Sequence, residues 1–512
     1  MTRRELGVFL AVVVVAVVLL VALGGGVLWT RPLWFDELCC VVFVVGDAPS
    51  PAEVVHRIAQ SWDYAPPLLH LMVWTAARFT NGVVTPVLLR SISLACVSFA
   101  LLFVYAALRR RFDRDASAGG TLMVAAHPLV VAHAFEGRFY GPWLLFAAAF
   151  AWGLGMERQR RRDVTIAVCS GLLCTIHWFG VISLGLMCIG AVSAHAQRWR
   201  DGVRRIAPSI AGVLVLLACL PMLTAQRATT SGVLWVEPLS GEQVMEVART
   251  FWLPMLPVVA AIVILTLIFR DGAKSRPAPD WRTQALHDPG IAATLALAFM
   301  PIALMFVSIV LQPSMVTRYA IVAALVWAPV IAFAVQSLPT PFRAPAVAAL
   351  AVWLCVMVQR SVTDRAEFAV AVAANAYAFE EAKALHVPVV FWGLHQIYPV
   401  AGPQRSPTTL ARYLDLSDST LATLFPSDAM APVRKKYRLD RDQARGHART
   451  YHFPILATQA QLESTPRFVL LATEATLPGG YKRAELFGRA LFPRHHVVRL
   501  SNRVSLFERA TP

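Results

Sequence analysis

Two adjacent carboxylates, Asp36 and Glu37, follow closely on the first apolar stretch of the chain, residues 6–28. About 20 apolar residues are enough to cross a bilayer, so this acidic pair is expected where the chain leaves the membrane. Charged groups at that depth are costly and usually line a cavity or meet a partner. A positioned carboxylate can act as a general base. A third acid, Asp63, follows in the same loop ahead of a Pro-Pro pair. The alternative interpretation is an ordinary polar loop. For Glu37 and Asp63 this alternative and a role in a site are equally plausible.

Two combinations of arginine and tyrosine form a second candidate group. Arg138 and Tyr140 lie between two apolar runs, and Arg318 with Tyr319 stands at the head of a later run. A guanidinium can hold a phosphate with two hydrogen bonds, and a phenol can donate another. Taken alone, the combination of Arg138 and Tyr140 is better explained by a snorkelling arginine beside an interfacial tyrosine. Taken with the acids, the two combinations predict a pocket for an anionic lipid phosphate beside a carboxylate base.

Histidines and cysteines give weaker indications. His177 lies in or near an apolar run, where a hydrogen bond between helices and a role in a site are equally plausible, whereas His127 and His133 are assigned to packing. The eight cysteines lack a paired CxxC pattern and fall mostly in apolar runs, which is typical of small buried hydrophobes. We therefore predict no metal-binding residues and no certain cofactor, although carboxylates beside a phosphate permit a divalent cation.

The composition indicates a membrane protein. Hydrophobic residues make up 57% of the 512 residues and charged residues only 15%, against about 25% charged in soluble chains. The mean hydropathy is +0.56. A net charge of +16 need not indicate nucleic acid, because lysine and arginine collect on the cytoplasmic side of membrane proteins. We expect a polytopic protein of the cell inner (plasma) membrane, without a nucleic-acid partner.

Hydropathy and basic clusters together predict about eleven transmembrane helices. The expected spans are residues 6–28, 86–108, 118–135, 142–156, two within 164–195 with a turn near 177–180, 206–223, 251–269, 291–311, 318–336 and 345–358. The basic clusters then all fall on one side, which places the N-terminus in the cytoplasm and residues 29–85 in an external loop. Within this loop, residues 67–79 are apolar but too short to span, and we expect a helix along the membrane interface.

The last part of the chain changes character. Residues 1–359 are predicted to form the transmembrane domain, and residues 360–512 an extracytoplasmic soluble α/β domain. Short β-like runs at 387–392, 468–472 and 497–500 alternate there with helical stretches such as 366–385. This domain could bind an acceptor, cap a site or only stabilise the protein.

The order of the motifs resembles the GT-C glycosyltransferases of the protein mannosyltransferase and aminoarabinose transferase type. The resemblance covers residues 1–340. In this comparison Asp36 matches the catalytic carboxylate of the first external loop, with Glu37 beside it, and Asp63 begins an element that usually ends His-Pro-Pro-Leu but has Ala65 before the prolines here. The other matches are Arg138 and Tyr140 with an E-x-R-x-Y element, Thr175 and His177 with a Thr-His element, and Arg318 and Tyr319 with a late Arg-Tyr pair.

The resemblance implies a GT-C-like, mainly α membrane enzyme. Its donor would be a sugar linked to polyprenyl phosphate, with mannose or a similar hexose or pentose transferred, with inversion, to an acceptor hydroxyl outside the membrane. The acceptor could be a protein, a lipid or a glycan. By resemblance Asp36 and Glu37 are the catalytic candidates, and Asp63, Arg138, Tyr140, His177, Arg318 and Tyr319 the substrate-binding ones. The alternative is a transporter or flippase of lipid-linked sugars that breaks no bond, but no internal repeat of the kind common in transporters is visible.

Overall fold

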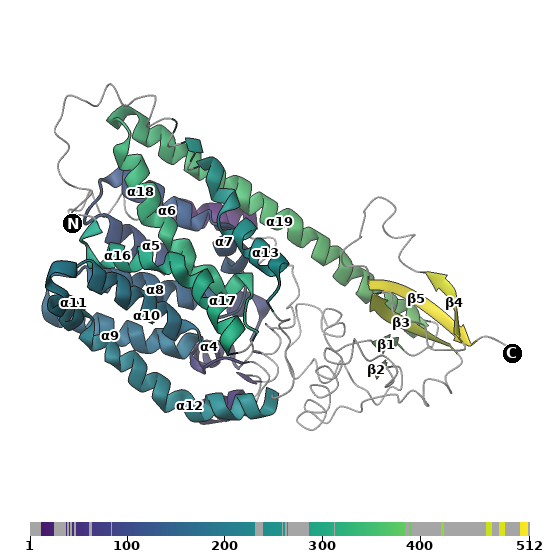
Figure 1. Ribbon diagram of the computed structural model, residues 1–512. Coiled ribbons are helices and arrows are strands. Elements are labelled where there is room, and N and C mark those ends of the chain that lie inside the picture. The colour runs from purple at the N-terminus through teal and green to yellow at the C-terminus, as the bar shows by residue number, and fades with distance from the viewer. Residues whose placement is uncertain are drawn as a thin grey trace.

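The chain forms a bundle of helices followed by a β-sheet (Figure 1). The computed structural model describes residues 12–24, 37, 40, 44–45, 48–60, 64–82, 84–230, 239–258, 260–261, 264, 286–311, 313–384, 389–391, 421–423, 467–473, 481–486 and 502–509. The catalytic candidate Asp36 and the substrate-binding candidate Asp63 lie outside these residues, as does part of the predicted span at 251–269.

The described part of the chain before the sheet is mainly helical. Their bounds are α3 (Pro51–Gln60), α4 (Leu68–Ala77), η2 (Arg78–Thr80), α5 (Pro86–Leu108), α6 (Arg114–Ala125), α7 (Pro128–Ala134), α8 (Tyr140–Leu154), α9 (Gln159–Ile176), α10 (Gly180–Ser193), η3 (Ala196–Arg198), α11 (Trp199–Ile206), η4 (Ala207–Ser209), α12 (Ile210–Thr230), α13 (Gly241–Phe251), η5 (Leu253–Met255), α16 (Pro289–Ala296), η7 (Leu297–Phe299), α17 (Met300–Val310), η8 (Thr317–Val326), α18 (Trp327–Ser337) and α19 (Thr340–Ala384). The turn predicted near 177–180 is present between α9 and α10. The helix expected at 67–79 corresponds to α4 and η2.

Among the described residues, five helical segments are long and apolar enough to cross a membrane. They are Pro86–Leu108, Trp199–Arg227, Pro289–Val310, Thr317–Ser337 and Thr340–Thr363. Large apolar side chains on their outer surfaces stay exposed, for example Leu217 on α12 and Phe306 on α17. An apolar outer surface of this extent fits a lipid environment. The chain is therefore a multi-pass membrane protein, and the number of eleven spans stays a prediction.

Helix α8 lies at the centre of the bundle, against α5 and α9. Tyr140, Trp143 and Phe150 on this helix are fully buried. Close packing against α5 depends on Gly141, because a Cβ there would lie only 2.5 Å from the carbonyl oxygen of Ser93. Small residues let helix backbones approach in this way in membrane proteins. The core of α5, α8 and α9 fixes the helix ends that carry the candidate site.

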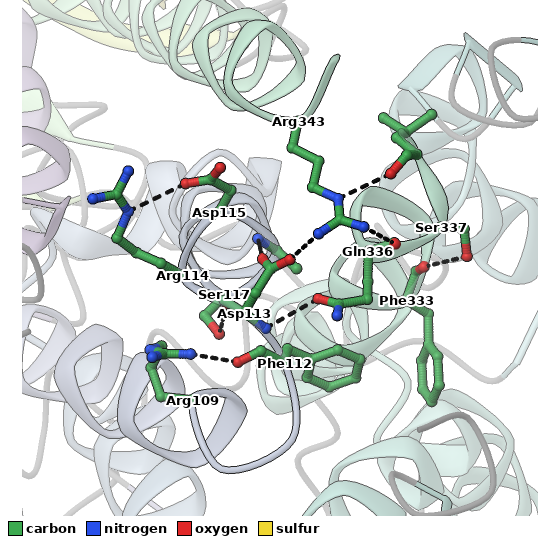
Figure 2. A network of polar contacts seen from close by, with 12 residues as sticks. Arg109, Phe112, Asp113, Arg114, Asp115, Ser117, Phe333, Gln336, Ser337 and Arg343 are labelled. Carbon is green, nitrogen blue, oxygen red and sulfur yellow. Dashed lines mark hydrogen bonds and ion pairs between the residues drawn. The ribbon is translucent and has the colours of Figure 1, made fainter. Parts of the chain in front are cut away.

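One end of the bundle is held by arginines. Figure 2 shows Arg343 donating to the carboxylate of Asp113 and to the backbone oxygen of Gln336, and so joining the start of α6 to the end of α18. Arg343 also donates to the backbone oxygen of Leu338. At the same end, Arg111 pairs with Asp288 at 3.1 Å. Asp288 also caps α16 by accepting from two backbone amides. These contacts bring helix ends with basic clusters together, as the predicted topology requires.

Beyond the bundle, α19 continues to Ala384 and reaches the sheet (Figure 1). The strands are β1 (Val389–Phe391), β2 (Leu421–Thr423), β3 (Arg467–Thr473), β4 (Tyr481–Leu486) and β5 (Asn502–Arg509). Their order is β2-β1-β3-β5-β4, with β1 parallel to β2 and β3, and β5 antiparallel to β3 and β4. The proposed boundary between residues 359 and 360 lies inside the continuous helix α19. A separate soluble α/β domain therefore stays a prediction, and the predicted strand at 497–500 lies outside the described residues.

Candidate functional site

A tight turn between α7 and α8 carries the first candidate residues. Arg138 is 5% exposed, and its guanidinium carbon lies 5.0 Å from the centre of the Phe139 ring. Tyr140 opens α8 and is fully buried. His133, at the end of α7, approaches Glu136 to 2.7 Å and lies with its ring 4.5 Å from that of Tyr140. The sequence assigned His133 to packing, whereas its contact with Glu136 places it among the polar groups of this turn.

Glu37 binds this turn and α5 together. Its carboxylate accepts hydrogen bonds from Arg90 Nε at 3.0 Å and Arg90 Nη2 at 2.8 Å. It also accepts one from the backbone amide of Gly137 at 2.8 Å. Both side chains of the ion pair are fully buried. A bidentate arginine and a backbone amide together hold a buried carboxylate in one orientation. The residue next in sequence to Asp36 is therefore fixed to α5 and to the Arg138 turn.

Gly137 is the residue that allows this contact. A Cβ at this position would lie 2.0 Å from Leu89 Cγ on α5, too close for any side chain to be accommodated without movement. The absent side chain lets the turn approach α5 closely enough for its amide to reach Glu37.

An aromatic cage surrounds His177. Its ring lies 4.2 Å from that of Phe139, 4.6 Å from Trp143 and 4.9 Å from Tyr319, measured between centres. His177 Nδ1 accepts a hydrogen bond from the backbone amide of Phe179 at 3.2 Å. A neutral ring in this arrangement carries its proton on Nε2. His177 therefore joins the turn between α9 and α10 to the Arg138 turn and to η8.

Arg318 and Tyr319 stand in the first turn of η8. The guanidinium carbon of Arg318 lies 5.9 Å from the centre of the Tyr319 ring. The Tyr319 ring is 6.3 Å from that of Phe139, on which Arg138 stacks. Two arginines more than 170 residues apart in the sequence thus stack on neighbouring rings of one cluster. Such a cluster can offer several N–H donors to one anionic group.

The loop that the sequence predicts to be external reaches the same region through Tyr64. Its ring lies 6.4 Å from that of Trp178, the residue that follows His177. Burial raises the pKa of the Tyr64 phenol above its ordinary value, and the positive charge of Arg227 offsets part of that rise. The phenol thus stays protonated and able to donate at neutral pH.

Six of the eight predicted site residues fall among the described residues, and their contacts bring them into one region. They are Glu37, Arg138, Tyr140, His177, Arg318 and Tyr319. Sequence reasoning missed Arg90, although an arginine within an apolar span is costly and usually functional or paired, which was the signal available. It also missed Trp143, whose aromatic character is unremarkable in an apolar run. Among the described residues no three His, Cys, Asp or Glu side chains cluster as metal ligands.

Comparison with known proteins supplies structural matches only. No protein-family model matches the sequence, and no curated protein matches it. The aminoarabinose transferase ArnT from Cupriavidus metallidurans matches in two crystal structures. The one bound to undecaprenyl phosphate has a TM-score of 0.54 at 13% identity, with all of both chains covered. The apo structure has a TM-score of 0.56 at 13% identity, with 99% of this chain and 100% of the other covered.

The archaeal oligosaccharyltransferase AglB from Archaeoglobus fulgidus also matches, with a TM-score of 0.44 at 12% identity over 91% of this chain and 69% of the other. ArnT and AglB are both GT-C glycosyltransferases. The ArnT comparison extends over essentially the whole chain, including the part after α18 that the sequence resemblance did not cover. The chain therefore has the GT-C fold of ArnT.

Proposed function

We propose that the chain is a glycosyltransferase that moves a sugar from a polyprenyl-phosphate-linked donor to an acceptor hydroxyl at the outer face of the membrane. The observation that carries the proposal is the convergence of the rings of Phe139, His177 and Tyr319 from three separate parts of the chain. Arg138 lies over the Phe139 ring and Arg318 over the Tyr319 ring. ArnT, which shares the fold, has been crystallised with undecaprenyl phosphate. A polyprenyl phosphate carrier fits a bundle whose outer surface is apolar and whose cluster offers two guanidinium groups.

In this proposal the arginines bind the phosphate. Transfer of the sugar breaks the bond between its anomeric carbon and the phosphate oxygen, which leaves negative charge on the phosphate. Arg138 and Arg318 stabilise that charge as it develops, which lowers the barrier. Tyr140, Tyr319 and His177 line the sugar and phosphate, and Asp63 helps to bind the substrate from the external loop.

The two adjacent acids take different roles. Asp36 accepts the proton of the acceptor hydroxyl while the hydroxyl oxygen attacks the anomeric carbon. Inversion at this carbon is what the resemblance to GT-C glycosyltransferases implies. Glu37 already accepts three hydrogen bonds from Arg90 and Gly137. We therefore assign Glu37 to positioning, in that it holds the start of the external loop against the Arg138 turn. From the sequence alone, both Asp36 and Glu37 were predicted as catalytic candidates.

The test is a transfer assay with purified protein in liposomes and radiolabelled lipid-linked sugars. Release of free polyprenyl phosphate together with sugar transfer supports an enzyme. Movement of intact lipid-linked sugar across the bilayer, without release of the phosphate, would instead establish the flippase alternative. An Asp36→Asn variant that folds normally is expected to lose turnover by a factor of at least about a hundred, as is typical when a general base is removed. Full activity of this variant would exclude Asp36 as the base.

The sugar donor is tested through Arg318. Arg318→Ala is expected to raise the KM for the donor or abolish turnover, because a cation that binds the phosphate has been lost. Added divalent cation should not restore it if the arginine acts directly. The wild-type protein should also be assayed after a chelator has removed divalent cations. Loss of its activity would show that a metal ion helps to bind the donor phosphate.

A further inference from the structure

Gln226 is a buried polar residue in a helix that otherwise faces lipid. Helix α12 forms most of the apolar segment Trp199–Arg227, and only 11% of the most apolar part of this segment is buried. Leu214, Leu217 and Leu220 on α12 are exposed. Gln226, near the C-terminal end of this helix, is fully buried. An amide that leaves water must find hydrogen-bond partners, so its surroundings are informative.

Within the described residues, the Gln226 amide makes three hydrogen bonds that reach two distant segments. Its Oε1 accepts from Trp178 Nε1 at 3.1 Å. Its Nε2 donates to the carbonyl oxygens of Ile58 and Ala65, both at 2.9 Å. The orientation of the amide is fixed by chemistry, since an indole N–H can only donate and a carbonyl oxygen can only accept. Neither a carboxylate nor an apolar side chain could make this set.

These partners belong to the candidate site. Ile58 and Ala65 lie on either side of Asp63 in the first external loop, and Trp178 directly follows His177. The Tyr64 ring lies 6.4 Å from the Trp178 ring. One side chain on α12 therefore joins the external loop to the turn that carries His177.

We propose that Gln226 is a positioning residue for the transfer reaction, holding the first external loop in register with the His177 turn. This inference rests on the proposed function. Groups that react must be held within a narrow range of distance and angle, and small displacements lower turnover more than binding. A loop held at two carbonyls by the same amide that binds Trp178 can shift relative to His177 only if those bonds break.

The sharpest test is Gln226→Glu, which keeps the shape and removes both donors when the new carboxyl is ionised. Its ionised form would face two carbonyl oxygens, whereas its protonated form can donate to one of them. We expect kcat to fall about tenfold with little change in KM, and the loss to grow as the pH is raised. Gln226→Met, which removes all three bonds, should show a similar loss at every pH. In the described part of this region, Tyr64, His177 and Arg227 are the titratable or charged groups named above or next to Gln226, and they are common to both variants.

The matched control is Thr224→Ala. Thr224 is exposed on the same helix and bonds only within it, to the carbonyl of Pro221. We expect wild-type kcat from this control. Wild-type kcat in both Gln226→Glu and Gln226→Met would overturn the proposal, as would identical pH profiles for the two variants.

A second measurement separates this inference from the proposed function. Hydrogen–deuterium exchange of the peptide spanning residues 58–66, in lipid nanodiscs, needs no substrate. Faster exchange there in Gln226→Met and in Trp178→Phe, but not in Thr224→Ala, supports the coupling; unchanged exchange overturns it. Trp178→Phe removes one bond alone and keeps the test valid if the Gln226 variants do not fold. If the wild-type protein transfers no sugar while exchange behaves as expected, the proposed function fails and the coupling does not.

Discussion

At the scale of single residues, the buried pair of Glu37 and Arg90 is the most constraining feature of the site. Both side chains are fully buried, and Gly137 adds a backbone donor. A buried ion pair is not itself evidence of high stability, because desolvation opposes the attraction between the charges. Removing one partner is different, since the other is left as a buried charge without compensation.

Arg90→Met should therefore destabilise the protein strongly, by about 3–5 kcal/mol. The double variant Glu37→Met/Arg90→Met should recover much of this loss, because no buried charge then remains. Thermal unfolding in detergent measures both. Additive effects of Glu37→Met and Arg90→Met would show that the two charges do not depend on each other. Activity should stay low in the double variant even where stability returns, since residue 37, next in sequence to the proposed base Asp36, would no longer be bound to Arg90 and to the Arg138 turn.

Gly137 offers a second test at this scale. Gly137→Ala should lower the free energy of unfolding by about 1–3 kcal/mol and lower turnover. The reason is that the new Cβ would lie only 2.0 Å from Leu89 Cγ. Adding Leu89→Ala makes room and should restore part of the turnover. Gly185→Ala is the control, because nothing lies within 4 Å of a Cβ at that exposed position. Equal behaviour of the two alanine variants would contradict the packing argument.

At the scale of elements, local patterns predict helices well and contacts between them poorly. Residues 86–108 were expected as a helix, and α5 has these bounds because a Pro at its first position and Thr85 as N-cap begin it. The break at His177 was also expected. Helix α19 extends past the end of its apolar run to Ala384, because an alanine-rich sequence can stay helical after its membrane-spanning pattern ends.

The long-range hydrogen bonds of the candidate site could not be predicted from local sequence patterns. Arg90 and Glu37 are 53 positions apart, and Gln226 lies 168 and 161 positions from its carbonyl partners. No periodicity links such positions, since they meet only after the helices pack. What the sequence did provide was the polar residues themselves, which stand out in apolar runs, and their order along the chain.

The network in Figure 2 gives a prediction about how elements are joined. Asp113 caps α6 through Ala116 N at 2.8 Å and also accepts from Arg343. Asp113→Ala loses both interactions and should lower the free energy of unfolding by about 2 kcal/mol. Asp113→Asn keeps the cap and should cost about half as much.

Arg343→Lys should be nearly as destabilising as Arg343→Ala, because an ammonium cannot reproduce the forked contacts to one carboxylate and two carbonyls. The control is Arg114→Ala, whose partner Asp115 and whose own side chain are partly solvent-exposed, so that a change within about 0.5 kcal/mol is expected. Melting temperatures in detergent would measure the series. A donor KM altered by these variants would contradict the placement of the network away from the site.

At the scale of the whole molecule, the candidate site and the arginine-rich end occupy opposite ends of the same helices. Arg90 lies near the start of α5, and Tyr140 and Thr317 open α8 and η8. The other ends of these helical segments reach the contacts of Arg110 with the Trp152 carbonyl and of Arg343 with the Gln336 carbonyl. A site built at one end and a basic cluster at the other give the molecule a direction across the membrane.

That direction can be measured by labelling single cysteines in a background with the eight native cysteines replaced. The first position for a cysteine is Glu157, which is exposed in the connection between α8 and α9, beside the arginines of residues 158–162. The second is Gly241, at the exposed start of α13. Positive charge is retained on the cytoplasmic side during insertion. A membrane-impermeant maleimide should therefore label Gly241→Cys in intact cells and Glu157→Cys only after permeabilisation. The reverse pattern would put the Arg138 and Arg318 cluster on the cytoplasmic side and require a donor presented to that leaflet.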